Sequence, residues 1–303
     1  MNALEQLSES LASAVQLAGE SIVRVEGRRR LPSSGLLWAA GDLVVTAHHT
    51  IERRGDLRIG LPGGEVVDGK VVGRDPATDL AVVKLPRAQG KPLTPAAADH
   101  VRVGHMALAV GRPGEAVQAT MGIVSAVDGS WRSRFGGPLD VFIQSDVVMY
   151  PGFSGGALVD AWGRLIGMNT SGLLRGVSLA VPATTLERIA RMLVEHGRVR
   201  RGYLGIGVQS ARLGAAHGTS GQTTGLLVAS VEVGSPAEKG GILLGDVLLS
   251  MGGQALTAMD DLLSALSGDV VGTALPVELL RGGKLTTLRV TVGERAAPSE
   301  DEE

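Results

Sequence analysis

Short apolar runs, separated by turn residues, fill the chain between Ser21 and about residue 182. Stretches such as GDLVVTAHH, DLAVVKL, HMALAVG and DVFIQSD are each a few residues long, and several alternate apolar and polar residues with period two. Many short strands with regular turn signals are typical of an all-β barrel or sandwich. These runs do not alternate with helices of about 10–15 residues, which argues against a parallel α/β sheet. We therefore predict that this part of the chain folds as a mainly β domain.

A helical pattern marks each end of this β region. Residues 1–20 predict an amphipathic N-terminal helix, because apolar residues recur near helical spacing at Leu4, Leu7, Leu11, Val15 and Leu17. The stretch ATTLERIARMLVEHG predicts a second helix, with Thr184 or Thr185 as its N-cap and Gly197 at its C-terminal end. We place the end of the first domain, which spans residues 21–197, at this glycine.

A second domain follows a short basic linker, RVRRG, at residues 198–202. Residues 203–295 then contain glycine-rich turns, a helical stretch AMDDLLSALSG and two strand patterns, LPVELLR and LTTLRVTV. Residues 296–303 form an acidic tail that we predict to be disordered. A length of 303 residues agrees with two domains of about 150 residues each.

The composition excludes several classes of protein. A net charge of −2 with both signs mixed argues against a nucleic-acid-binding protein, which would carry a basic face. The absence of cysteine excludes disulfides, thiolate metal sites and cysteine nucleophiles. No run of about 18 apolar residues occurs, so we predict no membrane span. His48 and His49 are adjacent, which is not the spacing of a metal-binding helix, and we expect neither a metal nor another cofactor.

The stretch PGFSGG places Ser154 among three glycines. By itself this pattern is typical of a turn, because glycine supplies positive φ and serine tolerates loops. A serine nucleophile also needs a histidine base, and the base needs a carboxylate that holds its tautomer. His48 and His49 end the strand GDLVVTAHH, and Asp75 and Asp79 lie in GRDPATDLAVVKL. The order His, Asp, Ser is that of the chymotrypsin-type proteases.

Three motifs resemble those of the HtrA (DegP-type) serine proteases. VVTAHHT resembles the family's histidine motif, in which the catalytic His stands three residues after a Thr, and this selects His49 over His48. DPATDLAVVKL is similar to the aspartate motif and selects Asp79 over Asp75. IQSDVVMYPGFSGGALVDAWGRLIGMNTSG resembles the serine region and makes Ser154 the nucleophile. The resemblance implies a chymotrypsin/trypsin-like double β-barrel with serine endopeptidase activity.

The resemblance also implies an oxyanion hole made by the backbone N–H groups of Gly152 and Ser154. Such donors stabilise the negative charge that develops on the substrate carbonyl oxygen. The chain departs from the family where Asn usually precedes the nucleophile and Pro follows the paired glycines, since it has Phe153 and Ala157 there. We expect Phe153 to contribute only its backbone to the oxyanion loop, while its bulk could shift the loop between resting and active conformations.

Val148 stands six residues before the nucleophile, where trypsin-like enzymes place the floor of the specificity pocket. No carboxylate is present there, so a basic substrate side chain would bind poorly. We expect cleavage after small or medium apolar residues. The alternative is that Val148 packs in the core.

Residues 203–295 resemble the PDZ domain that follows the protease domain in HtrA proteins, most visibly in GSPAEKGGILLGDVLLSMGGQAL. The resemblance implies a loop that binds a peptide's terminal carboxylate, formed by Tyr203, Leu204, Gly205 and Ile206. A neighbouring sheet edge would accept the peptide as an added strand. The helix beginning at Ala258 would form the other wall, with Leu262, Leu263 and Leu266 either in the pocket or in the core.

The resemblance implies an ATP-independent serine endopeptidase that degrades unfolded or damaged proteins, with a PDZ domain that binds peptide C-termini for substrate recognition or activation. The alternative is a peptide-binding, chaperone-like module with latent or lost proteolysis. Family members are commonly trimers, so we expect a homotrimer, although the first aromatic residue is Trp38 and an N-terminal aromatic contact is missing. The start has no basic, apolar leader pattern, so we predict a cytoplasmic location, or an extracytoplasmic one if a leader was trimmed.

Overall fold

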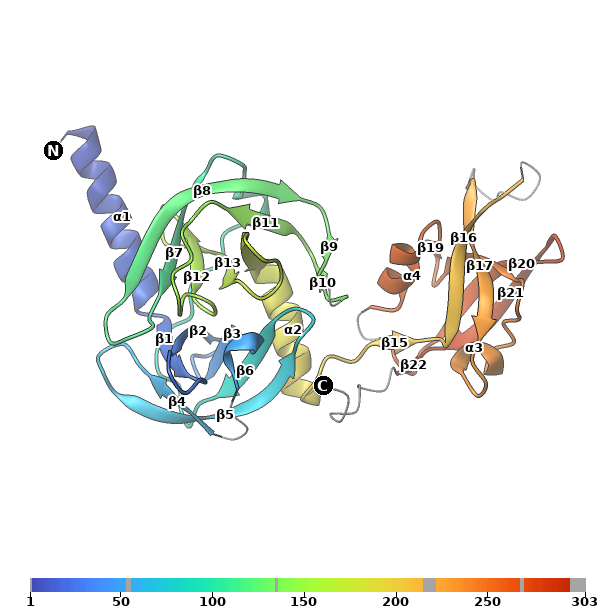
Figure 1. Cartoon of the computed structure of the whole chain (residues 1–303), viewed down its shortest axis with the longest axis horizontal. Coiled ribbons are helices and arrows are strands. Elements are labelled where there is room, and N and C mark those ends of the chain that lie inside the picture. The colour runs from blue at the N-terminus through green and yellow to red at the C-terminus, as the bar shows by residue number, and fades with distance from the viewer. Residues whose placement is uncertain (1, 53–55, 134–135, 215–221, 268–269, 295–303) are drawn as a thin grey trace. The chain divides into compact units, whose positions relative to one another are not determined.

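The computed structural model describes residues 2–52, 56–133, 136–214, 222–267 and 270–294. The chain divides into two compact units, Met1–Val199 and Arg200–Glu303 (Figure 1). The predicted acidic tail, residues 296–303, lies outside the described residues.

The first unit begins with helix α1 (Ala3–Gly19), which a capping box starts. The Asn2 side chain accepts the Glu5 N–H at 2.9 Å, and the Glu5 carboxylate accepts the Asn2 N–H at 2.8 Å. Ala14 and Ala18 are buried, and their small size brings the helix close to strands of the second barrel. The larger apolar side chains of α1, such as Leu4 and Leu17, remain exposed.

Six antiparallel strands close the first barrel in the order β1-β2-β3-β6-β5-β4. Their bounds are β1 (Ile22–Glu26), β2 (Ser33–Trp38), β3 (Leu43–Ala47), β4 (Asp56–Gly60), β5 (Val66–Asp75) and β6 (Leu80–Lys84). A closed barrel has no free sheet edge, which explains how strands that, apart from β5, have only five or six residues form a stable domain. A 3₁₀ turn, η1 (His48–Thr50), follows β3 directly.

The second barrel has the same number of strands, in the order β11-β14-β13-β12-β7-β8. Their bounds are β7 (Met106–Gly111), β8 (Gln118–Asp128), β11 (Phe142–Ser145), β12 (Ala157–Asp160), β13 (Leu165–Thr170) and β14 (Ser178–Pro182). A 3₁₀ turn, η2 (Ala98–His100), precedes the barrel, and a short ribbon of β9 (Trp131–Arg132) and β10 (Pro138–Leu139) extends from it. The predicted double β-barrel is confirmed.

Helix α2 (Ala183–His196) contacts strands of both barrels. It ends at Gly197, whose φ of 71° is the left-handed conformation that favours glycine. The prediction that Thr184 or Thr185 caps its start is wrong, because the helix already begins at Ala183 behind Pro182. Proline fits a helix start because its missing N–H needs no partner there.

The second unit is a five-stranded antiparallel path, β16-β17-β18-β20-β21, with β16 at one edge. The strands of this path are β16 (Ile206–Arg212), β17 (Thr224–Val231), β18 (Val247–Met251), β20 (Ala274–Arg281) and β21 (Lys284–Thr291). The short strands β15 (Gly202–Tyr203), β19 (Gln254–Ala255) and β22 (Gly293–Glu294) lie outside the path. Two short helices, α3 (Pro236–Lys239) and α4 (Met259–Ala265), complete it. The bidentate pair of Arg281 and the buried Asp246, with N–O distances of 2.9 and 2.7 Å, ties β20 to the turn before β18.

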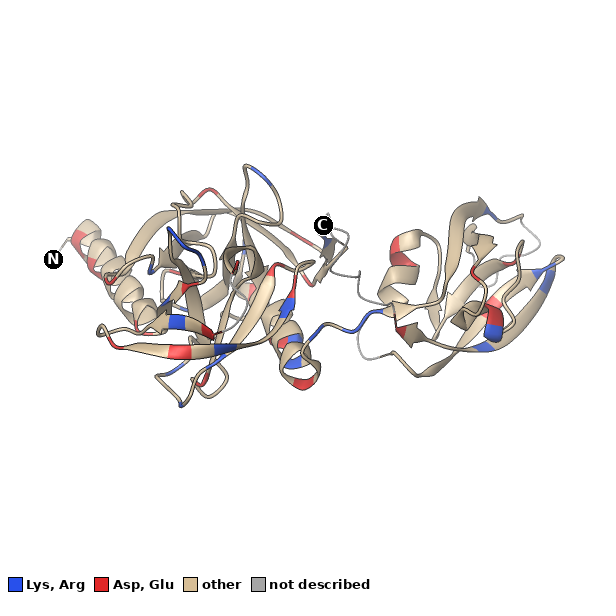
Figure 2. Ribbon diagram, turned by 60° about the horizontal axis from the view of Figure 1, so that its bottom comes forward, with Lys and Arg blue, Asp and Glu red and all other residues tan. Residues whose placement is uncertain are grey.

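Basic and acidic residues are interspersed along the chain in both units (Figure 2). Of the helices that the structure describes, none combines the length and the apolar character needed to cross a bilayer.

Candidate active site

His49 lies in the 3₁₀ turn that follows β3, and Asp79 holds it by two hydrogen bonds. The ring Nδ1 of His49 is 2.7 Å from Asp79 Oδ2, and the backbone N–H of His49 donates to Asp79 Oδ1 at 2.9 Å. A carboxylate at Nδ1 selects the tautomer that carries its proton there, which leaves Nε2 unprotonated. Asp79 is 3% exposed, whereas His49 is half-buried. The arrangement therefore orients a histidine base.

Asp79 itself occupies an uncommon backbone conformation in the turn between β5 and β6. Its φ is +56°, a left-handed value that Asp tolerates better than most residues. The turn is shaped by Asp75, whose carboxylate accepts the N–H and the hydroxyl of Thr78 at 3.2 and 2.6 Å. The two aspartates of this stretch thus differ, because Asp75 supports the turn and Asp79 contacts the histidine.

Thr170, which ends β13, and Gly172, which follows it, lie against the His49–Asp79 pair. The Thr170 hydroxyl donates to Asp79 Oδ2 and accepts the N–H of Gly172 at 3.0 Å. A Cβ at position 172 would lie 2.7 Å from both Asp79 Oδ2 and His49 Nδ1, so only glycine fits there. Sequence reasoning missed Thr170, since a threonine at a strand end has no signal of its own.

Ser154 lies in the loop before β12, and this loop requires glycine at two positions. Gly152 has φ +90°, and a Cβ there would come within 2.6 Å of the Pro113 side chain. Gly155 has φ +87°, and its Cβ would lie 2.0 Å from the Ser34 carbonyl oxygen. The loop thus passes against the first barrel, where no other residue type fits.

The peptide group between Gly152 and Phe153 is fixed at both ends. The Ser34 hydroxyl donates to the Gly152 carbonyl at 2.7 Å, and the Phe153 N–H donates to the Tyr150 carbonyl at 3.0 Å. The next carbonyl, that of Phe153, accepts the Gly156 N–H at 2.9 Å. These bonds determine which way the Phe153 and Ser154 amides point.

The amides of Gly152 and Ser154 are left without acceptors. Within the described residues, neither N–H donates a hydrogen bond to another group. In a trans peptide the N–H points opposite to the carbonyl, so anchoring the Phe153 carbonyl directs the Ser154 N–H away from the loop's own contacts. Backbone donors without an acceptor beside a serine hydroxyl are the kind of group that an oxyanion requires, and the oxyanion role of these two amides stays a prediction.

The Ser154 hydroxyl bonds to Ser171 in this structure. The two Oγ atoms are 3.1 Å apart, and the Ser171 N–H lies 3.4 Å from Ser154 Oγ. Between the described His49 and Ser154, no hydrogen bond is present. Catalytic hydrogen bonds are often long in the absence of substrate and tighten in the complex. Ser171, which sequence reasoning also missed, belongs to the same MNTSG stretch as Thr170.

Phe153 contributes more than its backbone. Its side chain is fully buried in the core of the second barrel, among Val147, Leu158, Ile166 and neighbouring small residues. Its ring meets that of Tyr150 edge-on, with centroids 5.9 Å apart and an interplanar angle of 85°. We expected the bulk of Phe153 to shift the oxyanion loop. In the structure the buried ring instead anchors the loop in the barrel core.

Val148 is 54% exposed, whereas its neighbour Val147 is 3% exposed. The alternative that Val148 packs in the core is therefore excluded. Its carbonyl accepts the Thr120 hydroxyl at 2.8 Å. The predicted role of this residue in substrate specificity stays a prediction.

In the second unit, the stretch from Tyr203 to Ile206 leads into the edge strand β16. The Leu204 carbonyl accepts the Ala237 N–H at 2.9 Å, and the Gly205 carbonyl accepts the Glu232 N–H at 2.8 Å. Among the described residues, the amides of Leu204 and Gly205 have no acceptor. Adjacent unpaired amides of this kind suit a carboxylate.

The loop geometry again depends on glycine and on a free sheet edge. Gly205 has φ +76°, and a Cβ there would lie 2.4 Å from the Ser235 side chain. The free edge of β16 lies beside α4. On α4 and its end, Leu262 and Leu266 belong to the hydrophobic core, whereas Leu263 is 38% exposed.

Comparison with known protein families divides the chain in a similar place. A family described as trypsin-like peptidase domain matches residues 33–168, and the PDZ domain family matches residues 202–292. A probable periplasmic serine endoprotease, DegP-like, of Chlamydia trachomatis serovar D is 33% identical over 286 residues, which cover 92% of this chain and 56% of the relative. The chain thus spans little more than half the length of such relatives.

Solved structures cover the chain more fully. The HtrA-type protease AlgW with decapeptide is 30% identical, with a TM-score of 0.78, and the match covers 95% of this chain and 99% of that one. A serine endoprotease from Yersinia pestis is 29% identical, with a TM-score of 0.75 and coverage of 94% and 98%.

The predicted cytoplasmic location is wrong. Relatives from Chlamydia trachomatis and Pseudomonas putida are named periplasmic endoproteases, which indicates an extracytoplasmic location. The prediction rested on the pattern of the first residues alone, and this pattern does not determine where the protein is located.

Proposed function

The chain belongs to the HtrA family of serine proteases, with a trypsin-like peptidase domain followed by a PDZ domain, and we propose that it is an ATP-independent endopeptidase that degrades unfolded or damaged proteins. The observation that carries this proposal is that a held histidine and a serine loop with free amides occur in one domain. Asp79 holds His49 by two hydrogen bonds, and among the described residues the amides of Gly152 and Ser154, beside the Ser154 hydroxyl, have no acceptor.

In the proposed mechanism, Ser154 Oγ attacks the carbonyl carbon of the scissile peptide bond while His49 Nε2 takes the hydroxyl proton. Asp79 stabilises the imidazolium that results. The oxyanion of the tetrahedral intermediate accepts hydrogen bonds from the amides of Gly152 and Ser154, each worth about 3 kcal/mol. His49 then gives its proton to the leaving amine as the C–N bond breaks, which leaves an acyl-enzyme ester on Ser154 Oγ. A water molecule attacks this ester while His49 Nε2 takes its proton, and His49 returns the proton to Ser154 Oγ as the ester bond breaks and the acid product leaves.

For the reaction to begin, the Ser154 hydroxyl must exchange its hydrogen bond to Ser171 for one to His49. A change of the serine side chain between staggered rotamers is part of this exchange. Substrate specificity for small or medium apolar side chains at the cleaved bond, with Val148 near the pocket, is part of the same proposal.

For the PDZ domain, a peptide-binding module, we propose binding of peptide C-termini. The terminal carboxylate would accept hydrogen bonds from the backbone N–H groups of Leu204 and Gly205, within the loop from Tyr203 to Ile206. The peptide would then pair with β16 as an added strand of the sheet. The unpaired amides and the edge position of β16 support this.

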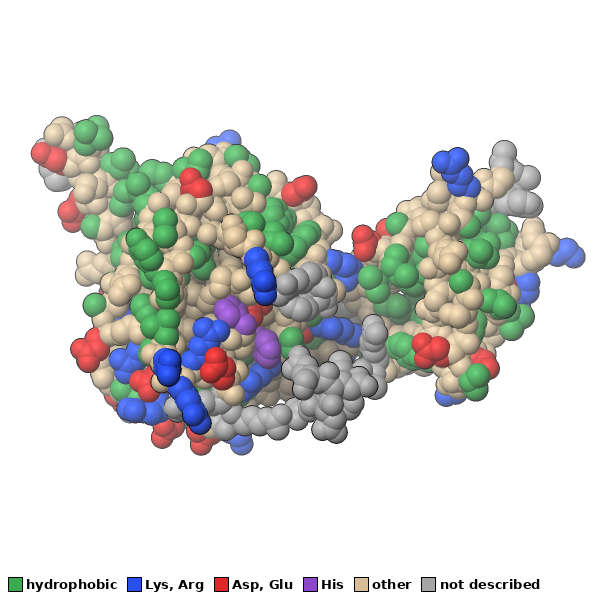
Figure 3. Space-filling view, viewed as in Figure 1, with side chains coloured by type: hydrophobic (Ala, Val, Ile, Leu, Met, Phe, Trp, Pro, Cys, Tyr) green, Lys and Arg blue, Asp and Glu red, His purple; other side chains and the backbone are tan. Residues whose placement is uncertain are grey.

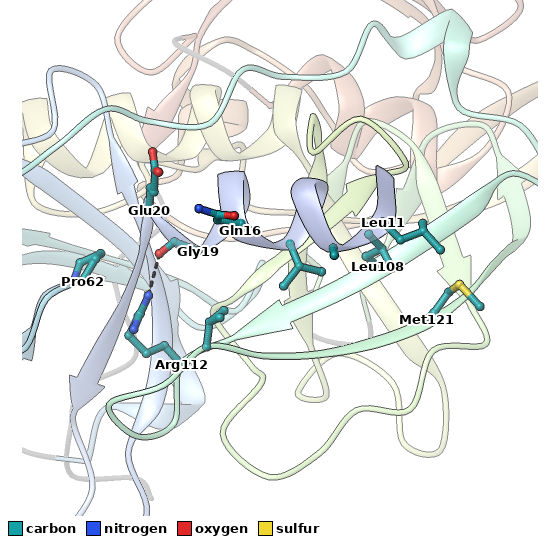
Figure 4. Close-up of a pocket in the computed structure, with 11 residues that line it drawn as sticks. Leu11, Gln16, Gly19, Glu20, Pro62, Leu108, Arg112 and Met121 are labelled. Atoms are coloured by element: carbon teal, nitrogen blue, oxygen red, sulfur yellow. Dashed lines mark hydrogen bonds between the residues drawn. The ribbon is translucent and has the colours of Figure 1, made fainter. Parts of the chain in front are cut away.

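We also propose that the protein assembles as a homotrimer. Apolar side chains are exposed along α1 (Figure 3), including Leu4, which is 77% exposed. Beside α1 lies a largely apolar hollow of about 640 Å³, where Leu11 faces Leu108 and Met121 (Figure 4). Exposed apolar surface of this kind favours contact with another copy of the chain.

The test is digestion of an unfolded protein, β-casein, by the wild type and by Ser154→Ala, with and without a hydrophobic C-terminal peptide. We expect the wild type to cleave casein and the variant to lose cleavage by at least about 10³-fold. The variant must melt at the wild-type temperature, so that the loss reflects chemistry. Intact casein with the wild type under every condition would favour the alternative, a peptide-binding module with latent or lost proteolysis.

A further inference from the structure

We propose that Ser34, on strand β2 of the first barrel, is a positioning residue that sets the oxyanion hole of the second barrel. The inference rests on the proposed function and names a residue that acts through the backbone of the serine loop. Ser34 is fully buried, and it is separated from the loop by more than a hundred residues of sequence.

Ser34 contacts both residues whose amides form the hole. Its hydroxyl donates to the Gly152 carbonyl at 2.7 Å, and its N–H donates to the Ser154 carbonyl at 3.2 Å. One residue therefore holds the carbonyl groups on either side of the nucleophile's own amide. The Gly155 N–H, bonded to Asn169 at 2.9 Å, fixes the second of these peptide groups from its other end.

The direction of the Ser34 hydroxyl is determined by a second bond. The Arg112 backbone N–H donates to Ser34 Oγ at 2.8 Å, so the hydroxyl proton is left to bond the Gly152 carbonyl. The Ser34 carbonyl accepts the Thr46 hydroxyl at 2.7 Å. Ser34 thus accepts hydrogen bonds at its hydroxyl and at its carbonyl, which hold it in place beside the loop.

Arg112 in turn is fixed by its side chain. The buried guanidinium donates to the carbonyls of Ile22 at 2.7 Å, Gly19 at 2.8 Å and Glu115 at 2.5 Å, and Figure 4 shows the bond to Gly19. Three charge-assisted hydrogen bonds, one from each guanidinium nitrogen, hold this buried cation in one position. The hydrogen bonds therefore run from the end of α1 through Arg112 and Ser34 to the oxyanion loop.

The consequence of losing the hydroxyl can be stated for the Gly152 peptide group. Glycine at φ +90° has no side chain to restrict its rotation, so its carbonyl depends on hydrogen bonds for its orientation. The peptide group that joins Gly152 to Phe153 lies between the two donor amides, those of Gly152 and Ser154. Without the Ser34 hydroxyl, one of the two bonds that hold this group is gone, and the oxyanion hole becomes less well ordered. Substrate contacts elsewhere do not change.

The test compares Ser34→Ala with Ser21→Ala as a matched control. Ser21 is also buried, and its hydroxyl also donates to a carbonyl, that of Lys91 at 2.6 Å, without contacting the serine loop. We expect Ser34→Ala to lower kcat by about 10- to 100-fold with KM changed less than about twofold, a smaller loss than removal of a whole donor. Ser21→Ala should keep kcat within about twofold of wild type.

A peptide boronate supplies the readout that a general loss of stability would not move. Its tetrahedral adduct places an oxygen in the hole, so its inhibition constant should rise for Ser34→Ala by the factor by which kcat falls. If Ser34→Ala does not fold, Ser34→Cys keeps the size of the side chain with a weaker donor, and the same two changes are expected at smaller size.

Equal kcat values for the Ser34 and Ser21 variants would overturn the inference, as would a loss of kcat without a parallel change in boronate affinity. A wild type that neither cleaves a peptide nor binds the boronate would instead contradict the proposed function itself.

Discussion

At the scale of single residues, the histidine next to the proposed base is as informative as the base. His48 donates its backbone N–H to the Asp79 carbonyl at 3.1 Å, but its ring Nδ1 is buried and, among the described residues, has no hydrogen-bond partner. Burial lowers the pKa of His48 below its usual value of 6.5, although the charge of Asp79 opposes this shift. The folded protein therefore keeps this ring neutral.

The lowered pKa of His48 predicts a loss of stability in mild acid. Between pH 6.5 and the folded pKa, the unfolded chain binds a proton that the folded chain does not, so stability falls as the pH falls. The melting temperature of the first unit should drop between about pH 7.5 and about pH 5, and His48→Gln should reduce that drop. Identical pH profiles for the two proteins would contradict this account.

The proposed triad could be named from the sequence because each of its residues stands in a long motif, whereas the residues that surround it in the structure were not predicted. Ser34, Thr170 and Ser171 are ordinary serines and threonines at strand ends. Their roles come from the approach of two barrels, which no local pattern encodes. Phe153 was read as an intrusion for the same reason, since only the folded structure places its ring in a core.

At the scale of elements, α2 was predicted from its periodicity and is observed over nearly the same residues. Four apolar side chains spaced by three or four residues give an unambiguous buried face. Its N-cap was predicted wrongly. Threonine is a good cap in general, but Pro182 ends a strand here and places the helix start two or three residues earlier than expected. The Thr185 hydroxyl instead accepts the Asp140 N–H at 3.0 Å.

The position of α2 against both barrels predicts a large effect of a single truncation. Ile189 is fully buried, so Ile189→Ala should lower the free energy of unfolding by about 2–4 kcal/mol through lost burial and a residual cavity. Val194, on the same helix, is 45% exposed, and Val194→Ala should cost less than about 1 kcal/mol. Chemical denaturation measures both, and similar losses would show that α2 is not a packing element.

At the scale of the whole molecule, two domains were expected from length and pattern, and the chain divides into two compact units. Length constrains the number of units because a single core rarely grows beyond a few hundred residues. The location of the protein in the cell was predicted wrongly, since neither fold nor site depends on it.

Assembly is the prediction that belongs to this scale. Light scattering should give a particle mass three times that of the 31.2-kDa chain, because the exposed leucines of α1 are covered in the assembly. Leu4→Glu, which puts a charge on a side chain that is 77% exposed, should reduce the mass toward that of one chain without changing the fold. A wild type with the mass of a single chain contradicts the trimer.

The burial of Phe153 limits how this protein could be regulated. Withdrawing the ring into water costs about 2–3 kcal/mol, so a rearranged loop would occupy only about one molecule in a hundred. An activator that converts molecules with the rearranged loop to the observed loop would therefore change the population of the observed loop very little. Under the proposed function, we therefore expect a C-terminus bound by the PDZ domain to act by raising the local concentration of its own chain near the enzyme, an advantage that saturating substrate would abolish.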